Sequence, residues 1–164
     1  TMSTIAEQAE NDRRKVNDLN FPLTSDCTLR EFLAHAAIES TRRLGVAGII
    51  TDSETGQTAR DIAAFRGPTP VLAICYKEKT QRWLNLSYGV IPIYQKEHVE
   101  QQFLFTAALR MLRQKGYINA DDNIAYLSGS FGEGGGTNFL EINRVRDIFD
   151  NSSSFKLPRH TRPQ

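Results

Sequence analysis

The chain has 164 residues, of which 40% are hydrophobic and 24% are charged, and its formal net charge is +1. This length suits one domain with a buried core. The balanced charge provides no electrostatic basis for binding nucleic acid or an anionic membrane. No apolar run approaches the ~18 residues that a membrane span requires, and the N-terminus lacks a signal-type apolar region. We therefore expect a cytoplasmic protein without a membrane or nucleic-acid partner.

The two cysteines, Cys27 and Cys75, lie far apart in unrelated contexts. No CxxC motif or Cys/His cluster accompanies them, so no zinc site is expected and the metal prediction is none. Cys75 ends the apolar run 71–75, which indicates a small buried side chain. The cysteine content suits a reducing compartment.

The first predicted element is a helix over residues 2–18. An isolated helix of this length is marginal in water and needs a packing partner. No turn or linker leads into Thr1, so we expect residues 1–20 to be the remnant helix of a preceding domain and residues 21–27 to be a linker. The narrow apolar stripe of this helix consists of Met2, Ile5, Ala6, Ala9 and Val16.

A second helix is expected from about residue 28 to Leu44, where Gly45 supplies a C-cap. Ser25 or Asp26 can cap its N-terminus, and Glu31 places a favourable negative charge in the first turns. His35 lies in this helix beside alanines, so a structural role is predicted for it.

From residue 46 onward, continuous apolar runs alternate with amphipathic segments. This order predicts a mostly parallel sheet with helices on both faces. The last two strands are joined without a helix and must run antiparallel. The expected fold class is α/β, a three-layer α/β/α domain over residues 28–150 with a five-stranded mixed sheet, followed by a flexible tail at 151–164. The predicted strands are 46–50, 71–76, 89–94, 124–128 and 137–142, and the helices between them are 57–65, 79–86 and 98–115.

Two loops should lie beyond the carboxyl ends of strands, where ligands gather in open α/β sheets. The loop after strand 46–50 combines hydroxyl groups with a helix N-terminus, which favours a phosphate. The loop after strand 124–128 is rich in glycine. The candidate residues are Ser53, Thr55, Gly56, Gln57 and Thr58 in the first loop, and Gly134, Gly135, Gly136 and Thr137 in the second.

Both loops also have simpler interpretations. Thr55 and Thr58 could act only as helix caps, and the glycine run could be a plain hairpin connection in which Glu133 repels an anion. Neither loop has the GxxxxGK[ST] pattern or a GxGxxG fingerprint in a βαβ unit. Likewise, no GxSxG elbow or carboxylate pair suitable for acid/base work is present, so no catalytic residue is predicted.

A set of motifs from about Thr28 to Val145 resembles the C-terminal domain of pyruvate kinase. The opening helix also resembles the last helix of that family's catalytic barrel. Each block is weak alone, but their order and spacing are specific as a set. The blocks are Gly48-Ile-Ile-Thr51, Ser53-Glu-Thr-Gly-Gln-Thr-Ala59, Phe65-Arg-Gly-Pro-Thr-Pro-Val-Leu-Ala-Ile74, Glu78-Lys-Thr-Gln-Arg82, Gly89-Val-Ile-Pro-Ile93, Lys115-Gly-Tyr117, Asp122-Asn-Ile-Ala-Tyr-Leu-Ser-Gly129 and Gly134-Gly-Gly-Thr-Asn138.

The resemblance implies that the intact enzyme transfers phosphate from phosphoenolpyruvate to ADP in glycolysis, with Mg2+ or Mn2+ and K+. The catalytic residues would lie in the barrel, so this segment alone would be inactive and need no cofactor. The resemblance also implies a tetramer, an effector phosphate held by the loop Ser53–Thr58, and a glycine-rich loop that closes over the ligand.

The sequence departs from the members of this family that respond to fructose 1,6-bisphosphate. Glu54 lies in the phosphate loop, Leu104 replaces an arginine, and Glu97 falls near an aromatic position. Ser130-Phe131-Gly132 stands where a Trp-Arg-Pro run is usual. Each lost charge-assisted bond or added like charge costs about 1–3 kcal/mol, so a monophosphate effector, or none, is favoured over a bisphosphate.

Three hypotheses follow. The leading one is a regulatory and assembly domain of pyruvate kinase. The alternatives are a free-standing, non-catalytic phosphate-binding α/β protein and an independent α/β enzyme.

Overall fold

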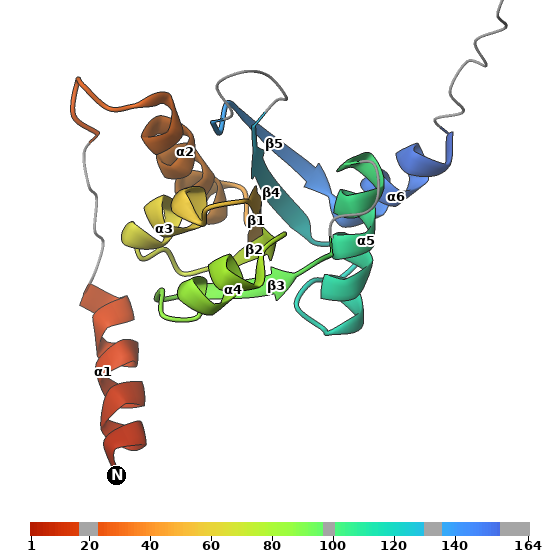
Figure 1. The fold of residues 1–164 in the computed structure, drawn as a ribbon. Coiled ribbons are helices and arrows are strands. Elements are labelled where there is room, and N and C mark those ends of the chain that lie inside the picture. Colours follow the sequence, from red (N-terminus) through yellow and green to blue (C-terminus); the bar gives the residue numbers. More distant parts are fainter. Residues whose placement is uncertain (17–22, 97–100, 130–135, 155–164) are drawn as a thin grey trace, which may run out of the picture.

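The computed structural model describes residues 1–16, 23–96, 101–129 and 136–154. It contains one mixed sheet with helices packed on both faces (Figure 1). The helices are α1 (Met2–Val16), α2 (Leu29–Arg43), α3 (Gln57–Ala64), α4 (Glu78–Leu84), α5 (Gln101–Gln114) and α6 (Val145–Ser154). The strands are β1 (Gly48–Ser53), β2 (Val71–Cys75), β3 (Val90–Tyr94), β4 (Asn123–Ser128) and β5 (Phe139–Arg144).

The five strands lie in the order β3-β2-β1-β4-β5. β1 pairs in parallel with β2 on one side and with β4 on the other, while β5 runs antiparallel to β4. The chain winds outward from β1 through β2 to β3 and then crosses to the far side of β1. This confirms the predicted α/β fold with a five-stranded mixed sheet and one antiparallel strand at its C-terminal end.

The reversal of winding direction at β1 explains why helices cover both faces of the sheet. Right-handed crossovers place the helices of the two directions on opposite faces of a sheet. The core on one face joins α2, α3 and α4 to the sheet, and the core on the other joins α5 and α6 to it. Adjacent residues Ile49 and Ile50 belong to different cores, and both are fully buried. β2 is buried at every position, as expected for a central parallel strand.

A capping box starts α2. The Thr28 hydroxyl accepts a hydrogen bond from the Glu31 N–H at 3.3 Å, and the Glu31 carboxylate accepts one from the Thr28 N–H at 2.7 Å. The prediction of Ser25 or Asp26 as the cap was therefore wrong, because the S/T-x-x-E pattern begins at Thr28. At the other end, Gly45 has a φ of +62°, which confirms its expected role after the helix.

His35 and Cys75 both have packing roles. The His35 ring meets Phe65 edge to face, with 5.6 Å between centroids. Cys75 is fully buried, and this burial raises the pKa of its thiol to about 11, so the side chain remains a neutral core residue near neutral pH.

Three elements differ from the sequence prediction. One is β5 (Phe139–Arg144), which begins and ends two residues later than the predicted strand 137–142. β1 covers 48–53 rather than 46–50, because its polar end Thr51-Asp52-Ser53 continues the parallel ladder with β2. A helix, α6, forms over Val145–Ser154, where no helix was predicted, and it continues past residue 150. Val145 is fully buried, and Ile148 and Phe149 pack against the same core, so this helix has an apolar face at helical spacing.

The N-terminal helix α1 lies away from the sheet in Figure 1. Met2 and Ile5, which belong to its predicted apolar stripe, are 85% and 67% exposed. Among the described residues, this first part of the stripe has no covering partner, which a helix of this length needs for stability.

Candidate functional site

The two candidate loops leave neighbouring strands at the same edge of the sheet. β1 and β4 pair in parallel, with Thr51 opposite Leu127, so their carboxyl ends point the same way. The winding direction of the chain reverses between these two strands. In open α/β sheets, this topological switch point is the usual ligand-binding position. The topology thus brings the hydroxyl-rich loop and the start of the glycine-rich segment together.

The turn into α3 positions the first loop. Gly56 is the N-cap in the left-handed conformation, with φ +82° and ψ +1°, and as a glycine it supplies no side-chain cap. The Thr55 hydroxyl accepts a hydrogen bond from the N–H of Gln57 at 3.4 Å. The following N–H groups of the first turn have no intrahelical partner, and the helix dipole favours an anion in front of them. The backbone here suits a phosphate group.

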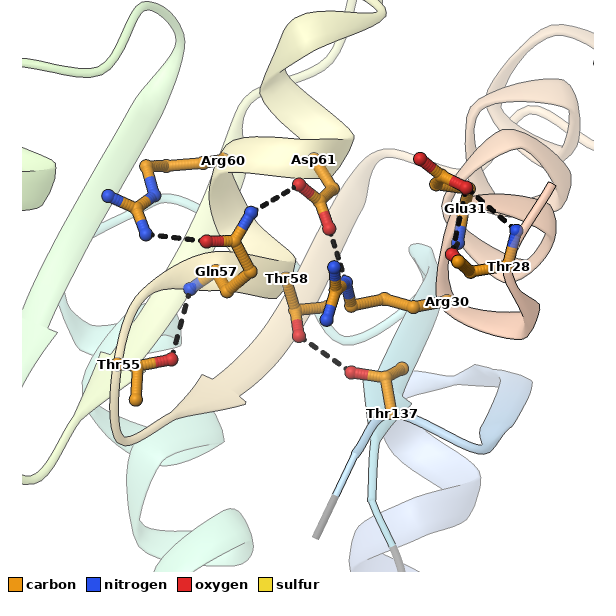
Figure 2. A network of polar contacts seen from close by, with 9 residues as sticks. All are labelled: Thr28, Arg30, Glu31, Thr55, Gln57, Thr58, Arg60, Asp61 and Thr137. Atoms are coloured by element: carbon orange, nitrogen blue, oxygen red, sulfur yellow. Dashed lines mark hydrogen bonds and ion pairs between the residues drawn. The ribbon is translucent and has the colours of Figure 1, made fainter. Parts of the chain in front are cut away.

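Thr58 connects the two candidate loops. Its hydroxyl lies 2.6 Å from the hydroxyl of Thr137, and the two residues are 8% and 9% exposed. Figure 2 shows the pair between the start of α3 and the segment leading into β5. Thr58 is therefore not a simple helix cap. It joins the first loop to the second.

Gly129 shows why a small residue is needed at the start of the second loop. A Cβ atom at this position would collide with the carbonyl oxygen of Gly136, so the two backbone segments can approach only because a side chain is missing. The N–H of Asn138 donates to the carbonyl of Ser128 at 3.0 Å and closes the base of the hairpin. Gly134 and Gly135 lie outside the described residues.

A chain of polar contacts holds α3 against α2 (Figure 2). Arg30 forms an ion pair with Asp61, whose other oxygen accepts a hydrogen bond from the Gln57 amide at 2.7 Å. The amide oxygen of Gln57 accepts from Arg60 at 2.7 Å. Both ends of the Gln57 side chain are therefore engaged, and this residue can meet a ligand only through its backbone.

The loop is also fixed from the side of β2. The Thr80 hydroxyl donates to the carbonyl of Glu54 at 2.6 Å, and the Lys77 ammonium lies 3.5 Å from the Glu54 carboxylate. The negative charge of Glu54 was predicted to lie in this loop, but the contacts of Lys77 and Thr80 with it were not predicted. Their position directly after the neighbouring strand β2 was the available signal.

Several predicted features fall outside what the structure describes. Nothing is described for the side chains of Ser53 and Leu104, or for Glu97 and residues 130–132. At Glu97, Leu104 and residues 130–132, the differences from the members that respond to fructose 1,6-bisphosphate are therefore known from the sequence alone.

The described residues offer little for metal binding or acid/base chemistry. They contain no group of three or more His, Cys, Asp or Glu side chains able to hold a metal ion. Burial raises the pKa of the Tyr126 phenol well above its ordinary value, and the nearby Asp52 carboxylate adds to this effect. Among the described helices, none is long and apolar enough to cross a membrane.

Comparison with known proteins matches residues 31–143 to the family model described as pyruvate kinase, alpha/beta domain. The pyruvate kinase of Borreliella burgdorferi is 31% identical over 150 residues, covering 89% of this chain and 31% of that protein. The pyruvate kinase of Clostridium acetobutylicum is 31% identical over 155 residues, covering 88% of this chain and 31% of that protein. The Bacillus licheniformis enzyme is 28% identical over 153 residues, covering 90% of the chain and 26% of that protein.

The chain thus spans about a third or less of the length of these relatives. The match covers β1 to β4, all of β5 except its last residue Arg144, and both sides of the switch point. The chain belongs to the pyruvate kinase family, as its alpha/beta domain.

Proposed function

We propose that this chain is the regulatory and assembly part of a pyruvate kinase, a cytoplasmic glycolytic enzyme that transfers phosphate from phosphoenolpyruvate to ADP. In this proposal, catalysis belongs to the part of the relatives that the chain does not cover. The family resemblance implies that the divalent cation and K+ are held there too. The chain alone would therefore bind and assemble without turning over substrate.

The regulatory role rests on the contact between Thr58 and Thr137. This contact places the N-terminus of α3, where the N-cap is Gly56, beside the segment that closes the second loop. A phosphate in front of α3 would receive backbone N–H groups and the favourable end of the helix dipole. The proposed effector site comprises Ser53, Thr55, Gly56, Gln57, Thr58, Gly134, Gly135, Gly136 and Thr137.

The charges beside this site favour a single phosphate. Glu54 opposes an anion at close range, and Lys77 partly offsets it at 3.5 Å. Both side chains are more than half exposed, so solvent weakens their effects. One phosphate can be held by the α3 N-terminus, whereas a second would have to overcome the Glu54 carboxylate. We therefore propose a sugar monophosphate or a nucleoside monophosphate as the effector class.

Calorimetric titration tests this proposal. Glucose 6-phosphate, AMP and fructose 1,6-bisphosphate would each be added to the purified chain. We expect saturable binding of at least one monophosphate below millimolar concentration, and weaker binding of the bisphosphate. Silence of all three up to millimolar concentration would rule out the effector role and leave assembly alone.

The assembly role is supported by β5, which lies at one edge of the sheet. Its Phe139 and Ile142 side chains are each 37% exposed. An exposed strand edge with apolar side chains is a template for pairing with another chain. Light scattering should detect a concentration-dependent oligomer that Ile142→Lys weakens, while Trp83→Lys on exposed α4 leaves it unchanged. A monomer at every concentration would contradict assembly through this edge.

A further inference from the structure

A pocket of about 390 Å³ lies on the face of the molecule covered by α5 and α6, in the layer opposite α3. It is lined by Arg110, Arg113 and Gln114 of α5 and by Phe149 of α6. α5 and α6 contact each other, and Figure 1 shows them side by side. This volume falls within the range of about 300–1,000 Å³ typical of small-molecule sites.

The polar wall of the pocket is built for an anion. Residues 110, 113 and 114 are spaced i, i+3 and i+4, so they project from one face of α5. Two guanidinium groups and an amide there supply many N–H donors, and guanidinium groups match the geometry of carboxylates and phosphates. Within the described part of the chain, neither Arg110 nor Arg113 forms an ion pair, and no acidic residue lines the pocket.

The helix α6, which supplies one wall of the pocket, carries charges of both signs. Arg146 of α6 adds positive charge but is already paired with Asp121. The acidic residues Asp147 and Asp150 belong to α6 but do not line the pocket. The pocket itself therefore combines two cationic side chains with no carboxylate.

The aromatic ring of Phe149 lines the pocket from α6, whereas the arginines line it from α5. Phe149 is partly buried and packs against the core beneath α5, so its orientation is fixed. The Arg110 guanidinium lies 5.9 Å from the centre of this ring, within the range of cation–π contact. A ligand whose own ring lies against the part of Phe149 that lines the pocket would place its charged group beside the arginines.

We infer that this pocket is a second binding site, distinct from the α3 loop, for a small organic anion that carries an aromatic ring and a phosphate or carboxylate group. The family match ends at residue 143, so α6, which supplies the ring, lies outside the matched residues. The arginines recognise the anionic group and Phe149 recognises the ring.

Phenyl phosphate and inorganic phosphate are suitable probes, because they differ only in the ring. Each would be titrated into the 15N-labelled chain while amide signals are followed by NMR. We expect saturable shifts at residues 110–114 and 149, with phenyl phosphate binding several-fold more tightly than phosphate. Arg110→Gln and Arg113→Gln should each weaken phenyl phosphate binding about tenfold, the loss of one charge-assisted bond.

Three further variants separate the contributions. Phe149→Leu keeps the apolar volume and should reduce phenyl phosphate affinity to that of inorganic phosphate. Arg82→Gln on α4 removes the same charge far from the pocket and should change nothing. Thr58→Val should also leave these shifts intact, so the result is independent of the α3 site. The inference would be overturned if no shifts appeared at about 20 mM phenyl phosphate. It would also be overturned if the shifts survived the loss of both arginines. Shifts that follow protein concentration instead of the probe would overturn it as well, because they would mark a contact between copies of the chain.

Discussion

The hydroxyl groups of Thr58 and Thr137 lie 2.6 Å apart in a buried position, although the residues are separated by 79 positions in the chain. Each hydroxyl has the other as its described side-chain partner. The pair therefore links the start of α3 to the segment before β5, and its energetic coupling can be measured directly.

Thr58→Val and Thr137→Val should each lower the free energy of unfolding by about 1–3 kcal/mol, because each leaves a buried hydroxyl without its partner. The double variant should lose less than the sum of the two, since it removes both hydroxyls. Urea denaturation followed by circular dichroism measures these values. Thr24→Val, at an exposed position in the segment before α2, is the control and should stay within about 0.5 kcal/mol of the parent. Strictly additive losses would show that the two hydroxyls are not coupled.

Gly56 should tolerate alanine less well than Gly45, although both have positive φ angles of 82° and 62°. An alanine at either position incurs the left-handed backbone cost of about 1–2 kcal/mol. At Gly56 the added Cβ would also lie 3.0 Å from Leu84, whereas nothing lies within 4 Å at Gly45. Thermal unfolding of Gly56→Ala and Gly45→Ala compares them. An equal loss in the two variants would mean that Leu84 moves aside without cost.

Glu54→Gln should raise the affinity for a monophosphate while leaving stability nearly unchanged. The Glu54 and Lys77 side chains are 68% and 61% exposed, and exposed ion pairs contribute little to folding. Removing the like charge beside a bound phosphate should tighten binding about tenfold at low salt. Lys77→Gln should weaken it, and Lys79→Gln on the same helix serves as the control. Calorimetric titration measures all three, and tighter binding by Lys77→Gln would contradict the proposed arrangement of charges.

The capping box at Thr28 predicts a specific loss of stability in acid. The pKa of Glu31 lies below its ordinary value of 4.5, chiefly because the Thr28 N–H donates to its carboxylate, with a further bond from the Thr28 hydroxyl. A lowered pKa in the folded state means that this stabilisation is full above pH 4.5 and is lost as the pH falls through the lowered value.

Glu31→Gln should therefore flatten the dependence of unfolding free energy on pH below 4.5. Thr28→Ala should cost about 0.5–2 kcal/mol at neutral pH. Glu7→Gln, on exposed α1, should leave the acid profile as it is. An unchanged profile in Glu31→Gln would place the acid sensitivity elsewhere.

Most of the fold was predictable because apolar periodicity follows burial closely. The run 71–75 is buried at every position and forms β2 as expected, and the segment 57–65 forms α3 with one residue fewer. β1 was misplaced because its end, Thr51-Asp52-Ser53, is polar and is held by backbone pairing with β2. A single sequence does not show such pairing.

The helix α6 was missed for a different reason. Val145, Ile148 and Phe149 have helical spacing, but the serine run that follows is typical of an irregular tail. The contact with α5 and the core stabilises the helix, and tertiary packing of this kind overrides local propensity.

The candidate site was predictable at the level of topology. Parallel strands place their carboxyl ends at one edge, so the two loops had to meet if β1 and β4 were neighbours. The pairing of Thr58 with Thr137 and the approach of Lys77 to Glu54 depend on side-chain positions across separate segments. Periodicity carries no information about such distances.

The position of β1 between β2 and β4 also has a consequence for the order of folding. A unit made of β1, α3 and β2 can form from nearby residues, but the other side of β1 stays open until the distant β4 arrives. Pairings between distant segments form slowly, because loop-closure entropy must be lost first. Effector binding between the loops that follow β1 and β4 would then return late in refolding. The recovery of binding would show that β4 has paired with β1 and that the sheet is complete.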